Sequence, residues 1–288
     1  MANVDGQEGQ AKVAAEWSIP ELAVMVAALL AAGIAAGLLA GLLGVGGGIV
    51  IVPVLFHLFS LLGFAEDVRM HVAVGTSLAT IIPTSIISAR AHAHRAAVDK
   101  GLLWALGPAV VAGTLAGAAI AGVARGDVLT AVFAVVAVAV AANMAFGMEG
   151  KAIRDGLPGG WRNLALGGVI GGISAMMGIG GGSLSVPVIS ACRYPIRTAV
   201  GTAAAIGLII AVPGAAGFIV TGWAKPSLPP GSLGYVNLFG FALIVPATML
   251  AAPWGARVAH AVKPQLLRKA FAVFLCLTSL RMIYGLLT

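Results

Sequence analysis

The chain has 288 residues, of which 60% are hydrophobic and only 9% are charged. Soluble domains carry about a quarter charged residues, so this composition excludes an ordinary soluble protein. The formal net charge of +7 is not taken as a sign of nucleic-acid binding, because basic loops gather on one side of membrane proteins.

The N-terminal stretch, residues 1–19, lacks the basic start of a signal peptide and is predicted to be an exposed tail. Beyond it, continuous apolar runs recur along the chain, which predicts an all-α polytopic membrane protein and disfavours a transmembrane barrel. The runs cover 21–43, 48–62, 72–91, 101–123 and 128–147, then 161–177, 183–192, 198–222, 233–258 and 266–287. The two cysteines form no metal or disulfide pattern, and no cofactor or metal is expected.

A glycine cluster interrupts the first half of the chain. The stretch "GLLGVGGG" (41–48) holds five glycines in eight residues. Glycine inside a helix costs roughly 1 kcal/mol relative to alanine, so the cluster needs a reason. The spacing fits neither a dinucleotide fingerprint nor a phosphate loop, since no Lys-Ser or Lys-Thr follows.

The same cluster returns in the second half, in a fixed order with other motifs. "GVGGGIVIVP" (44–53) matches "GIGGGSLSVP" (178–187), and "AVGTSLA" (73–79) matches "AVGTAAA" (199–205). Asp99 likewise falls opposite Asn237. We interpret the chain as two homologous halves, at 20–147 and 163–288, joined by a polar linker at 148–162.

Five runs in each half predict that the second copy lies upside down in the bilayer. If every run reverses direction, 12 of the 17 Lys and Arg residues fall on one side and four on the other, with Arg281 inside a run. Positive loops stay in the cytoplasm, so the linker is predicted to be cytoplasmic and both termini non-cytoplasmic.

The run at 183–192 is too short to cross a membrane. About ten helical residues reach ~15 Å, half of a ~30 Å hydrocarbon core. The glycine clusters are therefore predicted to be tips of helical hairpins, re-entrant in the second half, that meet near the midplane. Inverted repeats with broken helices meeting there are typical of secondary transporters.

The paired "GxGGG…VP" motifs, each followed by "AVGT", resemble the sulfite exporter TauE/SafE family over about residues 21–287. The resemblance implies a bacterial inner-membrane transporter of small sulfur-containing or organic anions. Sulfite export is the first hypothesis, and uptake of thiosulfate or another small organic anion is the alternative. An intramembrane enzyme or an assembly partner of a sulfur pathway is a more remote alternative.

Backbone N–H groups at the two tips are the predicted anion ligands, because glycines expose them and a helix N-terminus carries partial positive charge. The alternative is that the glycines serve only tight turns and close packing. The residues in question are Gly46, Gly47 and Gly48 in the first half, and Gly180, Gly181 and Gly182 in the second.

Hydroxyls near the tips are further candidate ligands. Thr76, Ser77 and Thr202 open the segments after the tips, and their alternative role is to cap or bond the backbone. Ser183 and Ser185 replace two isoleucines of the first copy. The second tip is therefore predicted to form the more polar side of the anion site.

Two ionisable side chains lie inside apolar runs. Arg281 sits ~22 Å along the last run, where charges are usually functional, although it could instead reach the outer interface. His57 could carry a proton, or simply pack.

All ten acids fall at or near segment ends, so a buried carboxylate relay is not expected. No nucleotide-hydrolysis motif is present, so gradients must drive transport, and the protein is not expected to be an enzyme. The expected partners are a small anion and the lipid bilayer but not nucleic acid, with a homo-oligomer left open.

Overall fold

The computed structural model describes residues 19–43, 47–146, 154–261 and 264–287. Within these ranges the chain is almost entirely helical, as the apolar runs predict. The helices are α2 (Ile19–Leu43), α3 (Gly48–Leu61), α4 (Glu66–His94), α5 (Lys100–Val123), α6 (Gly126–Phe146), α7 (Gly160–Met177), α8 (Gly182–Ala191), α9 (Ile196–Gly222), α10 (Leu238–Ala261) and α11 (Pro264–Leu287).

Helix boundaries follow local chemistry. Asp99 caps α5, its carboxylate accepting from the N–H of Leu102 at 3.0 Å. The residue before α10, Asn237, accepts in the same way from the N–H of Gly240 at 2.8 Å. Side-chain acceptors at this position satisfy N–H groups that a helix start leaves unpaired.

The predicted ninth segment, 233–258, is wrong at its beginning. Residues 232–237 form two short antiparallel strands, β1 (Ser232–Leu233) and β2 (Val236–Asn237). Gly234 between them has φ of 54°, a left-handed conformation that ends helical continuity and that glycine adopts without strain. The buried apolar side chains here, Tyr235 and Val236, belong to a strand turn rather than to a helix.

Six helices of the described chain are long and apolar enough to cross a membrane: α4, α5, α6, α9, and most of α10 and α11. α3 and α8 are shorter apolar helices of 14 and 10 residues. The protein is therefore a multi-pass membrane protein.

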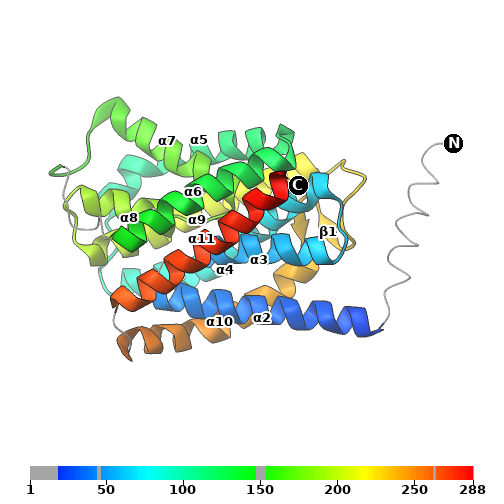
Figure 1. Cartoon of the computed structure of the whole chain (residues 1–288). Helices are drawn as coiled ribbons and strands as arrows, with labels where there is room; N and C mark the ends of the chain where they lie inside the picture. Colours follow the sequence, from blue (N-terminus) through cyan, green and yellow to red (C-terminus); the bar gives the residue numbers. More distant parts are fainter. Residues whose placement is uncertain (1–18, 44–46, 147–153, 262–263, 288) are drawn as a thin grey trace.

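The helices form layered pairs (Figure 1). α2 runs beside α10 along one side of the molecule, and α5 and α7 lie along the opposite side. α4 packs against α9 between these pairs, and α6 packs against α11. α3 lies against α4, and α8 lies against α9, so both short helices join the central layer.

The two outer pairs make corresponding contacts through glycines of α2 and α7. A Cβ added at Gly33 would lie 2.7 Å from Ala247 Cβ of α10. One added at Gly167 would lie 2.8 Å from Ala109 Cβ of α5. Small residues at both places let the helix backbones approach closely, which is how membrane helices commonly associate. Each pair joins one helix from each half of the chain.

Two corresponding hydrogen bonds join the halves in the central layer. The Thr76 hydroxyl accepts from the N–H of Asn237 at 2.9 Å. The Thr202 hydroxyl accepts from the N–H of Asp99 at 3.0 Å. The threonine of each "AVGT" motif thus holds the loop that leads into a helix of the other half.

Candidate functional site

The start of α3 meets the glycine-rich stretch between α7 and α8 inside the molecule. A Cβ added at Gly48 would lie 2.7 Å from the carbonyl oxygen of Gly178 and 3.1 Å from Ile179 Cα. The Ser77 hydroxyl donates to that same Gly178 carbonyl at 2.7 Å. The sequence prediction that the two glycine-rich stretches approach each other agrees with these contacts, and Ser77 serves to hold them together.

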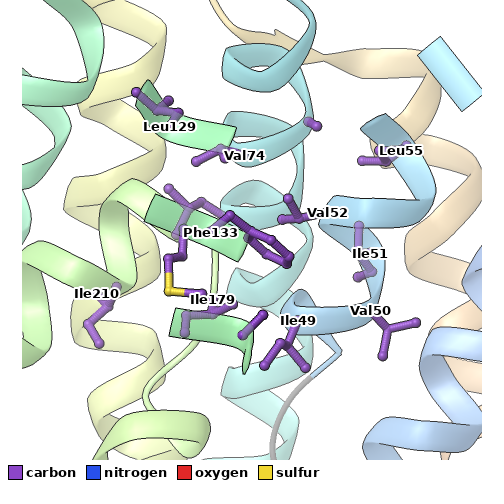
Figure 2. Close-up of a cluster of buried hydrophobic side chains, with 14 of the residues drawn as sticks. Ile49, Val50, Ile51, Val52, Leu55, Val74, Leu129, Phe133, Ile179 and Ile210 are labelled. Atoms are coloured by element: carbon purple, nitrogen blue, oxygen red, sulfur yellow. The ribbon is translucent and has the colours of Figure 1, made fainter. Parts of the chain in front are cut away.

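The start of α3 is surrounded by apolar side chains. Figure 2 shows Ile49, Val50 and Val52 among Val74, Phe133 and Ile179, and all six are buried. The N–H groups of residues 50 and 51 both donate to the Gly47 carbonyl at 3.0 Å. This helix start is therefore closed by apolar packing. Its backbone is no different in kind from that of α8, where the N–H of Ser185 donates to the Gly181 carbonyl at 2.8 Å.

The start of α8 is different, because its polar groups are buried without partners. In the described part of the chain, no acceptor pairs with the backbone N–H groups of Gly181, Gly182, Ser183 or Leu184. The hydroxyls of Ser183 and Ser185, 5% and 0% exposed, also make no hydrogen bond there. Buried groups of this kind are normally satisfied by side chains, water or a ligand.

A hydroxyl of α4 converges on this place through a gap left by Gly207 of α9. A Cβ added at Gly207 would lie 3.0 Å from Ser85 Oγ and 3.3 Å from the Gly181 backbone nitrogen. The next nearest atom from outside α9 among the described residues, Ser85 Cβ, lies 4.0 Å from this point. The absence of a side chain at Gly207 therefore leaves space beside both the Ser85 hydroxyl and the backbone nitrogen of Gly181.

Neither Ser85 nor Gly207 was singled out by the sequence argument. The repeat offers a signal, since Gly207 stands where the first half has Ile81. Ile81 fills the corresponding space with its side chain, 2.7 Å from a Cβ added at Gly48. The second half thus has Ser183, Ser185 and Gly207 where the first half has three isoleucines. The polar groups therefore lie at the start of α8 and have no counterpart at the start of α3.

The structure places the remaining tip candidates as follows. Gly46 lies outside the described residues. Gly47 precedes α3 with φ of −67°, and a Cβ there would make only ordinary contacts at 3.4 Å and beyond. A Cβ at Gly181 would lie 2.6 Å from the Ala203 carbonyl oxygen, so this glycine also serves close packing against α9. A Cβ added at Gly180 would have room, because its nearest neighbour, Ile81 Cγ2, would lie 3.4 Å away.

Thr76 and Thr202 do not stand at the start of α8 but bond the backbone of the other half, as described above. His57 and Arg281 come within electrostatic reach of each other, toward the far end of α3. Arg281 is exposed on α11, while the His57 ring nitrogen Nε2 is buried and has no hydrogen-bond partner among the described residues. The structure therefore groups these two residues with each other rather than with Ser183.

The chemistry of the α8 start is that of donors without a fixed charge. N–H and O–H groups converge at the positive end of a helix, an arrangement that favours an anion. Among the described residues no cluster of three or more His, Cys, Asp or Glu side chains is placed to hold a metal ion. The arrangement can bind and orient a small oxyanion.

Comparison with known proteins identifies the family. The sulfite exporter TauE/SafE family model matches residues 29–282. The chain belongs to the sulfite exporter TauE/SafE family. No solved structure matches the chain.

Relatives of this TauE/SafE protein occur in bacteria and archaea. A probable membrane transporter protein of Haemophilus influenzae is 32% identical over 245 residues, covering 83% of this chain and 90% of the relative. The probable membrane transporter protein YunE of Bacillus subtilis is 25% identical over 84% of this chain and 91% of its own length. A probable membrane transporter protein of Methanocaldococcus jannaschii is 24% identical over 78% of this chain and 83% of its own length. Each match covers most of both chains. All three relatives are named as probable membrane transporter proteins.

Proposed function

We propose that this TauE/SafE protein is a secondary transporter that moves a small sulfur oxyanion or sulfonate, with sulfite export as its first candidate activity. The observation that carries the proposal is the group of buried, unpartnered donors at the start of α8. A transporter must hold its substrate inside the bilayer with groups that replace water. Ser183, Ser185 and the adjacent N–H groups provide such donors, while Ser85 and Gly207 shape their surroundings.

Alternating access by two inverted repeats is the mechanism that we propose. The matched contacts of Gly33 and Gly167, and the matched bonds of Thr76 and Thr202, support a repeat whose copies interlock. The linker would lie in the cytoplasm and both termini on the outer side of the inner membrane. The two glycine-tipped hairpins would meet at the midplane and rock relative to each other.

Cysteine labelling tests this topology. In a background without Cys192 and Cys276, a single cysteine at Arg154 and one at Ala224 are expected to react with a membrane-impermeant maleimide from opposite faces. Both positions are exposed, so access depends on the side of the membrane. Position 154 should label only from the cytoplasmic face. Labelling of both from one face would contradict the inverted repeat.

Flux through the purified protein tests the function itself. Liposomes that contain the protein are expected to release sulfite faster than protein-free liposomes, with the anion chemically unchanged. Thiosulfate, sulfoacetate and sulfate form the comparison panel. Preference for thiosulfate would favour the uptake alternative, and conversion of the substrate would indicate an enzyme. Protein that is folded but moves none of the four anions would overturn the proposal.

A further inference from the structure

The fully buried polar residues of this protein carry almost no charge. Among the described residues, the buried polar set contains no Lys, Arg, Asp or Glu, and its only ionisable member is His71. That set consists of His71, Thr76, Ser77, Thr80, Ser85, Thr114, Thr130, Ser174, Ser183, Ser185, Thr202, Asn237, Thr248 and Ser279. His71 lies 14 residues before Ser85 on α4, or ~21 Å along the helix.

The cations on elements around α8 all stand at its periphery. Four of them are exposed: Arg90 on α4, Arg162 on α7, Arg193 after α8 and Arg197 on α9. Arg69 on α4 is half-buried, but it lies 16 residues before Ser85, or ~24 Å along the helix. Arg197 lies ten residues before Gly207, or ~15 Å along α9. Arg193 already pairs with Asp155 at 2.8 Å. Cys192, which can also ionise, follows the other end of α8, nine residues or ~14 Å past Ser183.

An anion at the start of α8 is therefore held by dipoles alone. The cost of removing an ion from water rises with the square of its charge, so a second charge raises it about fourfold. The attraction of a helix N-terminus and of hydroxyl dipoles rises only in proportion to charge. Without a buried cation, this balance turns against a dianion while it still allows a monoanion.

We propose that the site at the start of α8 binds oxyanions that carry a single negative charge and rejects dianions. The inference rests on the proposed function, and it deepens it by naming the form of the substrate. For sulfite the bound species is then the hydrogen sulfite ion. Its proton also suits the site, because Ser183 and Ser185 each have lone pairs that accept a hydrogen bond as well as a proton to donate.

Equilibrium binding to the purified full-length protein in detergent tests this. Methanesulfonate remains a monoanion throughout the working pH range, sulfate remains a dianion, and sulfite loses its proton within it. We expect methanesulfonate to bind with constant affinity and sulfate to bind at least tenfold more weakly. The apparent dissociation constant of sulfite should rise about tenfold per pH unit once the singly charged form is depleted.

The methanesulfonate series is the matched control for titration of the protein itself, including His57, His71, His92 and His94. Sulfate that binds as tightly as methanesulfonate would overturn the inference while leaving the proposed function intact. So would sulfite affinity that stays constant or rises with pH against a constant methanesulfonate series. Failure of all three anions to bind folded protein would overturn the site and the inference together.

Discussion

Alanine at Gly207 is expected to lower sulfite flux in liposomes by at least tenfold while the protein remains folded. The added methyl group would lie 3.0 Å from Ser85 Oγ and 3.3 Å from the Gly181 nitrogen, in the space that the proposed site leaves for its ligand. Its tightest contact is with the end of a serine side chain, which can move by a few tenths of an ångström. A lost hydrogen bond to a charged ligand costs about 1.5–3 kcal/mol, which is at least about tenfold in affinity.

Gly168→Ala is the matched control for this variant. Gly168 also lies inside a helix, α7, and a Cβ there would meet nothing within 4 Å. The control is expected to keep the parent's flux and melting temperature. Parent-like flux from Gly207→Ala would remove Gly207 from the site, since the same methyl group would then be shown to be harmless to transport.

The double variant Ser183→Ala/Ser185→Ala is expected to lose anion binding without losing stability. Both hydroxyls are buried and unpartnered within the described chain. An unsatisfied buried polar group costs about 1–3 kcal/mol, so its removal should leave the ligand-free melting temperature unchanged or higher. Stabilisation of the parent by added sulfite reflects binding and should disappear in the variant. Thermal melts with and without sulfite measure both effects.

Ser77→Ala is expected to have the opposite effect, with lower stability and unchanged anion binding. The Ser77 hydroxyl donates to the Gly178 carbonyl, so its loss should destabilise the protein by about 1 kcal/mol. If the Ser183/Ser185 variant behaves like Ser77→Ala, with a lower melting temperature and intact sulfite stabilisation, those hydroxyls are structural. The site would then have to be sought elsewhere in the protein, with Arg281 and His57 as the next candidates.

The continuous apolar runs were sufficient to predict most of the helices, because a bilayer demands long apolar stretches wherever the chain crosses it. This reasoning failed at residues 233–237, where Tyr235 and Val236 are buried in a turn between two short strands and Gly234 has a left-handed backbone. Hydropathy reports burial but not the conformation that achieves it.

The candidate site was predicted only in part. Ser183 stood out because it replaces an isoleucine of the first copy. Ser85 and Gly207 lie in the middle of long helices, where nothing local distinguishes them, and they reach the α8 start only through the packing of α4 and α9. Gly47 and Gly181 looked equivalent in sequence, but a Cβ added at Gly181 would lie 2.6 Å from a backbone carbonyl oxygen, against 3.5 Å at Gly47.

The bonds that cross between the halves have a consequence for biogenesis. The hydrogen-bond partner of Thr76, Asn237, is synthesised 161 residues later in the chain. At synthesis rates of about 5–20 residues per second, that delay is roughly 8–32 s. α2 likewise remains without its packing partner until α10 has been synthesised. α5 and α7 are separated by only one helix and can pack together early. The first half therefore spends this interval in the membrane incomplete, with Thr76 and the small-residue face of α2 still unpaired. Both surfaces find their partners only after the ribosome has delivered residue 237 and the helix that follows it.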